Sequence, residues 1–159
     1  MKLKYIKPFI DSVHDFFMMM LDLKAVQGQI GIRESESATF EITSLIGLSG
    51  VARGSVAMSF PHSTAINLAN KLLGAEFNEL NRSVTDAVAE SANIVAGSAK
   101  SKFIKADGKP IDLSLPNVVI GKNYVVSYPS MANWIEVPFD SDLGEFSMRV
   151  TFELDEANT

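Results

Sequence analysis

The stretch VTDAVAESANIVAGSAKSKF, residues 84–103, decides the fold because it predicts one long amphipathic helix. At 100° per residue, six of its apolar side chains fall within an arc about 100° wide. They are Val84, Val88, Ala92, Val95, Ala99 and Phe103. An apolar arc of this width packs against the rest of a fold, so we expect this face to be buried.

The opposite side of the predicted helix carries two carboxylates, a carboxamide and a glycine: Asp86, Glu90, Asn93 and Gly97. Glu90 and Asn93 are three residues apart, so their side chains are neighbours on the helix surface. A carboxylate pairs with a lysine, and a carboxamide both donates and accepts hydrogen bonds, so it can hold a water molecule. A glycine inside a helix costs about 1 kcal/mol relative to alanine, and it often marks close approach by another backbone.

These residues suit a helix that completes another protein's active site, because the sequence places no nucleophile, histidine base or metal cluster beside them. A lone Glu-x-x-Asn is more often a solvated helix face. Here the pattern is longer and reads Asp86-x3-Glu90-x2-Asn93-x22-Pro116. It resembles the signature of the CheC/CheX/FliY family of chemotaxis phosphatases, and Gly97 is similar as well.

The resemblance implies that the chain hydrolyses the aspartyl phosphate of a phosphorylated CheY-like response regulator. Glu90 would then pair with a lysine of the regulator, and Asn93 would orient the attacking water. Asp86, Gly97 and Pro116 match motif positions that we expect to support the helix and the segment after it. The alternative is a non-catalytic module of the same fold, which binds the regulator or acts as a flagellar-switch domain.

A second predicted helix, residues 8–21, carries Asp11, Asp15 and Met18 at the same spacing, each 75 positions upstream of Asp86, Glu90 and Asn93. Some members of the family have two motif helices related by duplication. Met18 stands where an asparagine would be needed, so this helix resembles a degenerate copy; the alternative is an ordinary core helix. The single intact motif favours the CheX branch.

The remaining sequence predicts strands and one more helix within a single domain, residues 1–159. Alternating apolar residues predict strands within 25–60 and at 116–121, 124–128, 134–139 and 145–154, with a helix at 64–73 and a loop at 104–115. Ser83 or Thr85 is the expected helix cap, and Met18 to Met20 are expected in the core. We predict an α+β, CheC-like fold of duplicated helix-plus-antiparallel-strand units, with long helices packed on a β-sheet.

The charge and the residue composition exclude several classes of partner and site. The net charge is −5 without a Lys/Arg cluster, which argues against nucleic acid and anionic membranes. The chain has no cysteine, and its two histidines lack metal-ligand spacing, so we expect no metal site. Neither a signal peptide nor a membrane span is evident, so the expected location is the cytoplasm.

The resemblance also implies how the protein assembles and what it requires. We expect no cofactor of its own, with Mg2+ held by the partner regulator. CheX-like proteins form homodimers by joining strands into a continuous sheet, so we expect a homodimer. The predicted strand at residues 145–154 is a candidate for the joining edge.

Overall fold

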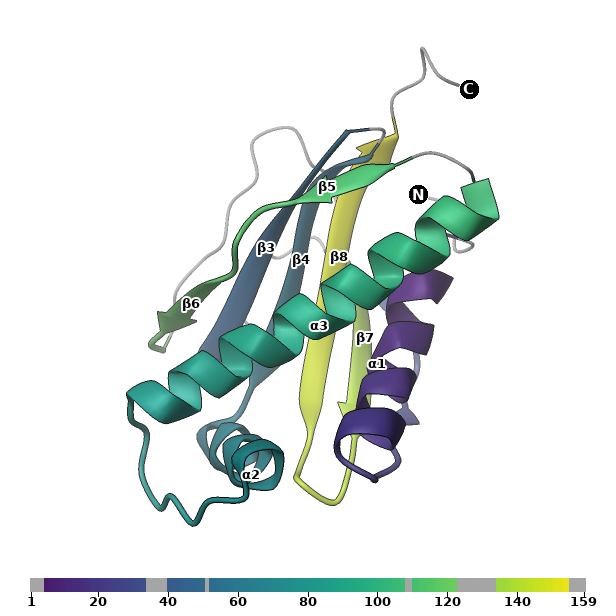
Figure 1. The fold of residues 1–159 in the computed structure, drawn as a ribbon. Helices are drawn as coiled ribbons and strands as arrows, with labels where there is room; N and C mark the ends of the chain where they lie inside the picture. Colours follow the sequence, from purple (N-terminus) through teal and green to yellow (C-terminus); the bar gives the residue numbers. More distant parts are fainter. Residues whose placement is uncertain (1–4, 34–39, 51, 108–109, 123–133, 155–159) are drawn as a thin grey trace.

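Three helices lie against one eight-stranded antiparallel sheet in the computed structural model, which describes residues 5–33, 40–50, 52–107, 110–122 and 134–154 (Figure 1). The helices are α1 (Lys7–Met20), α2 (His62–Leu73) and α3 (Arg82–Asp107). Helix α3 crosses the face of the sheet diagonally, and α1 packs beside its C-terminal half. The predicted long helix is therefore present, and it extends four residues beyond Phe103.

The sheet contains two central hairpins and four short outer strands. The strands are β1 (Val26–Gln27), β2 (Gly31–Arg33), β3 (Ile42–Gly50), β4 (Ala52–Phe60), β5 (Ile111–Leu113), β6 (Asn117–Ile120), β7 (Trp134–Asp140) and β8 (Phe146–Leu154). Their order is β1-β7-β8-β4-β3-β5, with β2 also paired to β7 and β6 to β3. The strand expected at residues 124–128 lies outside the described residues.

The topology repeats, as the duplicated-unit prediction requires. Each unit runs helix, two short strands, two long strands: α1 with β1 to β4, then α3 with β5 to β8. The units join where β4 pairs with β8, with Val56 opposite Val150. The short strands of each unit pair with a long strand of the other unit: β1 and β2 pair with β7, and β5 and β6 pair with β3. The α+β, CheC-like architecture is confirmed.

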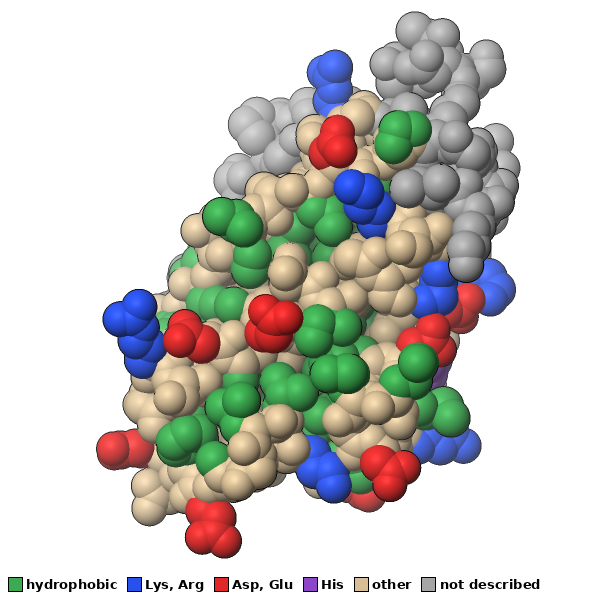
Figure 2. Space-filling model, in the orientation of Figure 1, with side chains coloured by type: hydrophobic (Ala, Val, Ile, Leu, Met, Phe, Trp, Pro, Cys, Tyr) green, Lys and Arg blue, Asp and Glu red, His purple; other side chains and the backbone are tan. Residues whose placement is uncertain are grey.

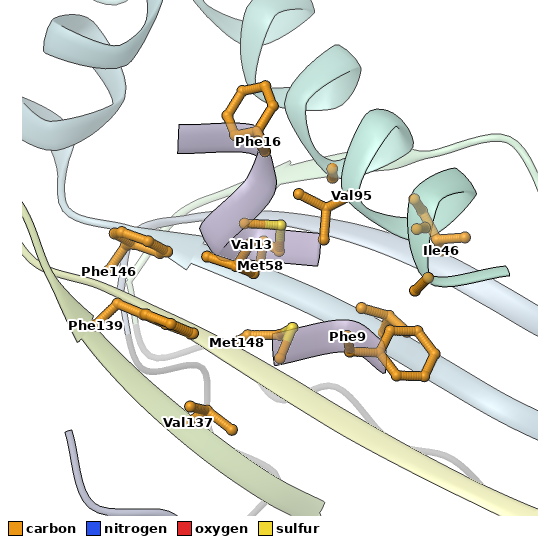
Figure 3. Packing of buried hydrophobic residues seen from close by; sticks show 14 of the residues in the cluster. Phe9, Val13, Phe16, Ile46, Met58, Val95, Val137, Phe139, Phe146 and Met148 are labelled. Atoms are coloured by element: carbon orange, nitrogen blue, oxygen red, sulfur yellow. The ribbon is translucent and has the colours of Figure 1, made fainter. Parts of the chain in front are cut away.

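The core lies between the helices and the sheet (Figure 3). Phe17 and Phe139 each stack on Phe146, with ring centroids 5.1 and 5.0 Å apart. Figure 3 shows Val13 of α1 and Val95 of α3 near Met58 of β4. Burying each such side chain stabilises the fold by roughly 1.5–3 kcal/mol, so these contacts fix α3 against the sheet.

Two predictions about outer elements are wrong. β8 is not an edge strand, because it is hydrogen-bonded to β4 on one side and to β7 on the other. The segment at residues 104–115 is not a simple loop, since α3 continues to Asp107 and β5 follows at Ile111–Leu113. Among the described strands, the edges of the sheet are β1 and β2 on one side and β5 and β6 on the other.

The three consecutive methionines at the end of α1 are also not core residues. The side chains of Met18, Met19 and Met20 are 65%, 81% and 51% exposed. Phe16 and Phe17 are buried instead, and the three methionines that follow are exposed where the helix ends. None of the helices within the described ranges is long and apolar enough to cross a membrane.

Candidate functional site

The N-terminus of α3 is fixed by Asn81. Its side-chain Oδ1 accepts a hydrogen bond from the backbone N–H of Val84 at 2.9 Å, which satisfies one of the free donors at the helix start. The predicted cap at Ser83 or Thr85 is wrong, because both residues lie inside the helix. The Thr85 hydroxyl instead donates to the carbonyl oxygen of Arg82 at 2.9 Å.

The apolar face of α3 is buried, as the periodicity predicts. All six of its predicted residues have almost no exposed surface: Val84, Val88, Ala92, Val95, Ala99 and Phe103. They pack against the sheet and the other two helices. This packing fixes the rotation of α3, and the rotation decides which side chains point into solvent.

The exposed face of α3 presents the motif residues Asp86, Glu90 and Asn93. Figure 2 shows acidic side chains on this side of the molecule, with hydrophobic side chains around them. Asp86 Oδ2 lies 4.0 Å from Arg82 Nε, a long contact between two well exposed groups that contributes little stability. Neither Glu90 nor Asn93 has a hydrogen-bond or ion-pair partner among the residues that the structure describes. Both side chains are therefore available to a partner.

Gly97 continues this face one turn beyond Asn93. Apart from the backbone of α3 itself, a Cβ added at Gly97 would meet no heavy atom of the described residues within 4 Å. The packing of these residues therefore gives no reason for a glycine at this position. Its cost of about 1 kcal/mol relative to alanine has no internal compensation.

The strands β5 and β6 run beside α3 in the opposite direction (Figure 1). Lys100 Nζ of α3 lies 3.8 Å from Asp112 Oδ1 of β5, which marks one point where the two segments lie side by side. A strand advances about 3.3 Å per residue and a helix about 1.5 Å. The four residues from Asp112 to Pro116 therefore span about nine helical residues. Pro116 comes level with the turn of α3 that holds Glu90 and Asn93.

Pro116 lies in a β-bulge between β5 and β6. Leu113 pairs with Leu48 and Asn117 pairs with Leu45, so three residues of this segment face only two residues of β3. Such a bulge holds one extra residue and bends its strand. Proline fits a bulge because it has no N–H to leave without a partner. The motif proline thus marks an irregularity in the edge of the sheet beside the candidate site.

The corresponding residues of α1 are engaged within the chain. Asp15 Oδ2 lies 2.8 Å from Lys102 Nζ of α3, and Asp11 Oδ2 lies 2.6 Å from Lys7 Nζ. Lys102 also donates hydrogen bonds to the hydroxyls of Ser12 and Ser98. No local pattern in the sequence indicates this pairing, because the two helices meet only in the folded chain. The α1 copy therefore lacks both the asparagine and a free carboxylate.

The site holds no visible means of catalysis by itself. Glu90 and Asn93 have neither a nucleophile nor a histidine beside them on α3. No group of three or more His, Cys, Asp or Glu residues could hold a metal ion within the described part of the chain. What the arrangement offers is a rigid helix that presents a carboxylate and a carboxamide, one turn apart, to another molecule.

Comparison with known proteins identifies the family. Residues 42–140 match the family model described as chemotaxis phosphatase CheX. The curated CheY-P phosphatase CheX of Thermotoga maritima is 26% identical over 124 residues, which cover 77% of this chain and 79% of that protein.

Solved structures agree with this assignment. The chemotaxis protein CheX from Vibrio vulnificus has a TM-score of 0.84 and 30% identity, covering 94% of this chain and 99% of that one. The fold also matches the CheX of a CheX–CheY–BeF3–Mg2+ complex from Borrelia burgdorferi, with a TM-score of 0.78 and 24% identity over 96% of this chain and 99% of that one. The chain belongs to the CheX family of chemotaxis phosphatases.

Proposed function

We propose that this protein hydrolyses the aspartyl phosphate of a phosphorylated CheY-like response regulator. The observation that carries the proposal is the pair Glu90 and Asn93, exposed one turn apart on α3 and without partners among the described residues. A relative named CheY-P phosphatase and a solved complex of a relative with CheY support this choice of substrate. The regulator supplies the phosphoaspartate, and α3 supplies positioning.

Glu90 is the docking residue of this mechanism. Its carboxylate pairs with a lysine of the regulator that lies beside the phosphoryl group. The pair is strengthened when the two surfaces exclude water, because the effective dielectric constant falls. Among the described residues, Arg82 pairs with Asp86 and no ion pair involves Glu90, so the carboxylate of Glu90 is left for the partner.

Asn93 is the catalytic residue. Its carboxamide accepts a hydrogen bond from the attacking water and donates another to fix its orientation, in line with the phosphorus–oxygen bond that breaks. In phosphoryl transfer, the protein mainly positions the reacting groups and stabilises the charge of the transition state. An asparagine on a well-packed helix can position the water without a general base in the chain.

The remaining motif residues support the site. Asp86 adds negative charge one turn before Glu90, Gly97 allows close approach one turn after Asn93, and Pro116 keeps the edge strand bent beside them. The chain needs no cofactor of its own in this mechanism. Mg2+ belongs to the regulator, as the composition of the Borrelia burgdorferi complex suggests.

The protein also acts as a homodimer in this proposal. Sheets join at exposed strand edges, and β8 is excluded because both its sides are paired. The two candidate edges are therefore β1 with β2, and β5 with β6. Sedimentation velocity tests the assembly: a dimer at micromolar concentration supports it, and a monomer contradicts it.

The decisive experiment measures phosphate release from a phosphorylated CheY-like regulator of the same organism. Wild-type protein should accelerate release, and Asn93→Ala should lower the acceleration at least about 100-fold while binding is retained. Binding without acceleration by the wild type would favour a regulator-binding module instead. Full activity in Asn93→Ala would refute the catalytic assignment.

A further inference from the structure

Leu115 is the most exposed of the large hydrophobic residues in the described part of the chain, at 83%. A single exposed leucine needs no special explanation. This one differs because it directly precedes the motif residue Pro116 and lies at the centre of the bulge between β5 and β6. Its position is set by the edge of the sheet rather than by a loose loop.

The bulge is held by three hydrogen bonds around Ser114. The Ser114 backbone N–H donates to the carbonyl oxygen of Gly47 at 3.0 Å. The Gly47 N–H donates to the Ser114 hydroxyl at 2.8 Å, and that hydroxyl donates to the Leu115 carbonyl oxygen at 3.1 Å. Bulges redirect side chains, and they are common next to active sites. These bonds hold the backbone at Leu115 so that its side chain points outward.

Leu115 also lies level with the catalytic residue proposed above. It is three residues beyond Asp112, whose carboxylate lies 3.8 Å from Lys100 of α3. Three strand residues span about seven helical residues, so Leu115 comes level with Asn93. A partner that reaches Asn93 on the exposed face therefore passes directly beside this leucine.

We propose that Leu115 is an apolar anchor for the receiver domain of the response regulator, next to its phosphorylation site. This inference rests on the proposed function. Glu90 and Asn93 supply charge and hydrogen bonds, which orient a partner more than they hold it. Affinity at protein interfaces comes mainly from a few buried apolar or aromatic contacts near the centre. Leu115 supplies such a contact beside the polar pair, and Figure 2 shows hydrophobic side chains flanking the acidic ones there.

The test measures binding and catalysis separately, with Leu115→Ala and a matched control. Met19→Ala is the control, because Met19 is 81% exposed and lies in the last turn of α1, outside both candidate dimer edges. For Leu115→Ala, we expect the Kd for the regulator with beryllofluoride and Mg2+, and the KM for the phosphorylated regulator, to rise about tenfold. Its kcat and melting temperature should stay unchanged.

The outcomes separate this inference from the proposed function. If the wild type hydrolyses the phosphorylated regulator and Leu115→Ala has the same Kd and KM as the wild type, Leu115 is not an anchor. The proposed phosphatase activity would be unaffected by that result. A raised Kd in Leu115→Ala without any hydrolysis by the wild type would support the anchor and refute the phosphatase. Equal rises in Leu115→Ala and Met19→Ala, or no binding by the wild type, would overturn the anchor.

Discussion

Lys102 Nζ of α3 lies 2.8 Å from Asp15 Oδ2 of α1, so the residue that corresponds to Glu90 in the first repeat is paired within the chain. Both groups are partly exposed, so the pair stabilises the fold only modestly, by about 0–1 kcal/mol. Its main consequence is functional, because the carboxylate of α1 is not free for a lysine of another protein. The two repeats thus have equivalent helices, but Asp15 is paired within the chain, whereas Glu90 is not paired with any described residue.

Rebuilding the motif on α1 should therefore fail. In an Asn93→Ala background, the changes Asp15→Glu and Met18→Asn restore the residue types of the motif on α1. We expect no recovery of phosphate release from the phosphorylated regulator, since Lys102 stays within reach of residue 15 and position 41, equivalent to Pro116, is Glu41. Recovered hydrolysis would mean that the motif residues are sufficient for activity on either helix, whatever surrounds them. As a control, Asp15→Asn in the wild type should leave kcat/KM within about twofold, the range of a weak surface pair.

Glu90→Gln tests the docking charge. The substitution keeps the shape and the helix propensity of the side chain but removes the charge that we propose to pair with the regulator's lysine. Loss of one partner of a charge pair inside an interface costs about 2 kcal/mol or more, so KM should rise about 30-fold. Increasing the salt concentration should weaken the wild type more than the variant, because salt screens the charge pair.

Asp86→Asn is the matched control for Glu90→Gln. Asp86 is on the same face, one turn away, and its carboxylate already lies 4.0 Å from Arg82. We expect a smaller rise in KM than in Glu90→Gln, with the melting temperature unchanged. Equal effects of the two substitutions would mean that the regulator responds to the total charge of the helix rather than to a specific pair at Glu90.

The sequence was sufficient for the long helix because its signal is local. The 3.6-residue periodicity from Val84 to Phe103 depends only on neighbouring residues, and all six predicted apolar positions are buried. Gly74 likewise ends α2 in the left-handed conformation, with φ 63°. Features that depend only on neighbouring residues can be predicted from the sequence without knowing the fold.

The errors have a different origin, since each depends on pairing between distant segments. The alternation in β8 shows that one face is buried, but it does not show that both edges are bonded, as they are to β4 and β7. Gly108 and Pro110 indicate a loop, yet Ile111–Leu113 pairs with the distant strand β3. The bulge that exposes Leu115 is likewise a mismatch in register with β3, which no local pattern records.

Asn81→Ala tests the cap that the sequence reading missed. Removing the Oδ1 acceptor leaves the Val84 N–H without its partner at the start of α3, which costs about 0.5–2 kcal/mol. For a domain of this size the melting temperature should fall by about 1–8 °C in thermal unfolding. Ser83→Ala is the control and should change the melting temperature by less than about 2 °C, because Ser83 is exposed inside the first turn. A larger fall in melting temperature for Ser83→Ala than for Asn81→Ala would mean that Ser83 is the cap.

Gly97→Ala separates stability from function at the turn of α3 beyond Asn93. Apart from the backbone of α3 itself, the new methyl group meets no atom of the described residues within 4 Å, so the substitution gains helix propensity without a steric cost. The free energy of unfolding should rise by about 0.5–1 kcal/mol, which raises the melting temperature by about 1–4 °C. If the regulator's backbone approaches at Gly97, the same methyl group should raise KM about tenfold or more, the cost of overpacking a close contact.

Ser101→Ala is the control for Gly97→Ala, because Ser101 is exposed on the same face one turn further and the substitution removes an atom rather than adding one. We expect it to leave KM unchanged. A Gly97→Ala protein that is more stable and binds the phosphorylated regulator as tightly as the wild type would show that no partner approaches this turn. A protein that is more stable but binds less tightly would assign the glycine to the interface, since a defect in the fold of α3 lowers stability and binding together.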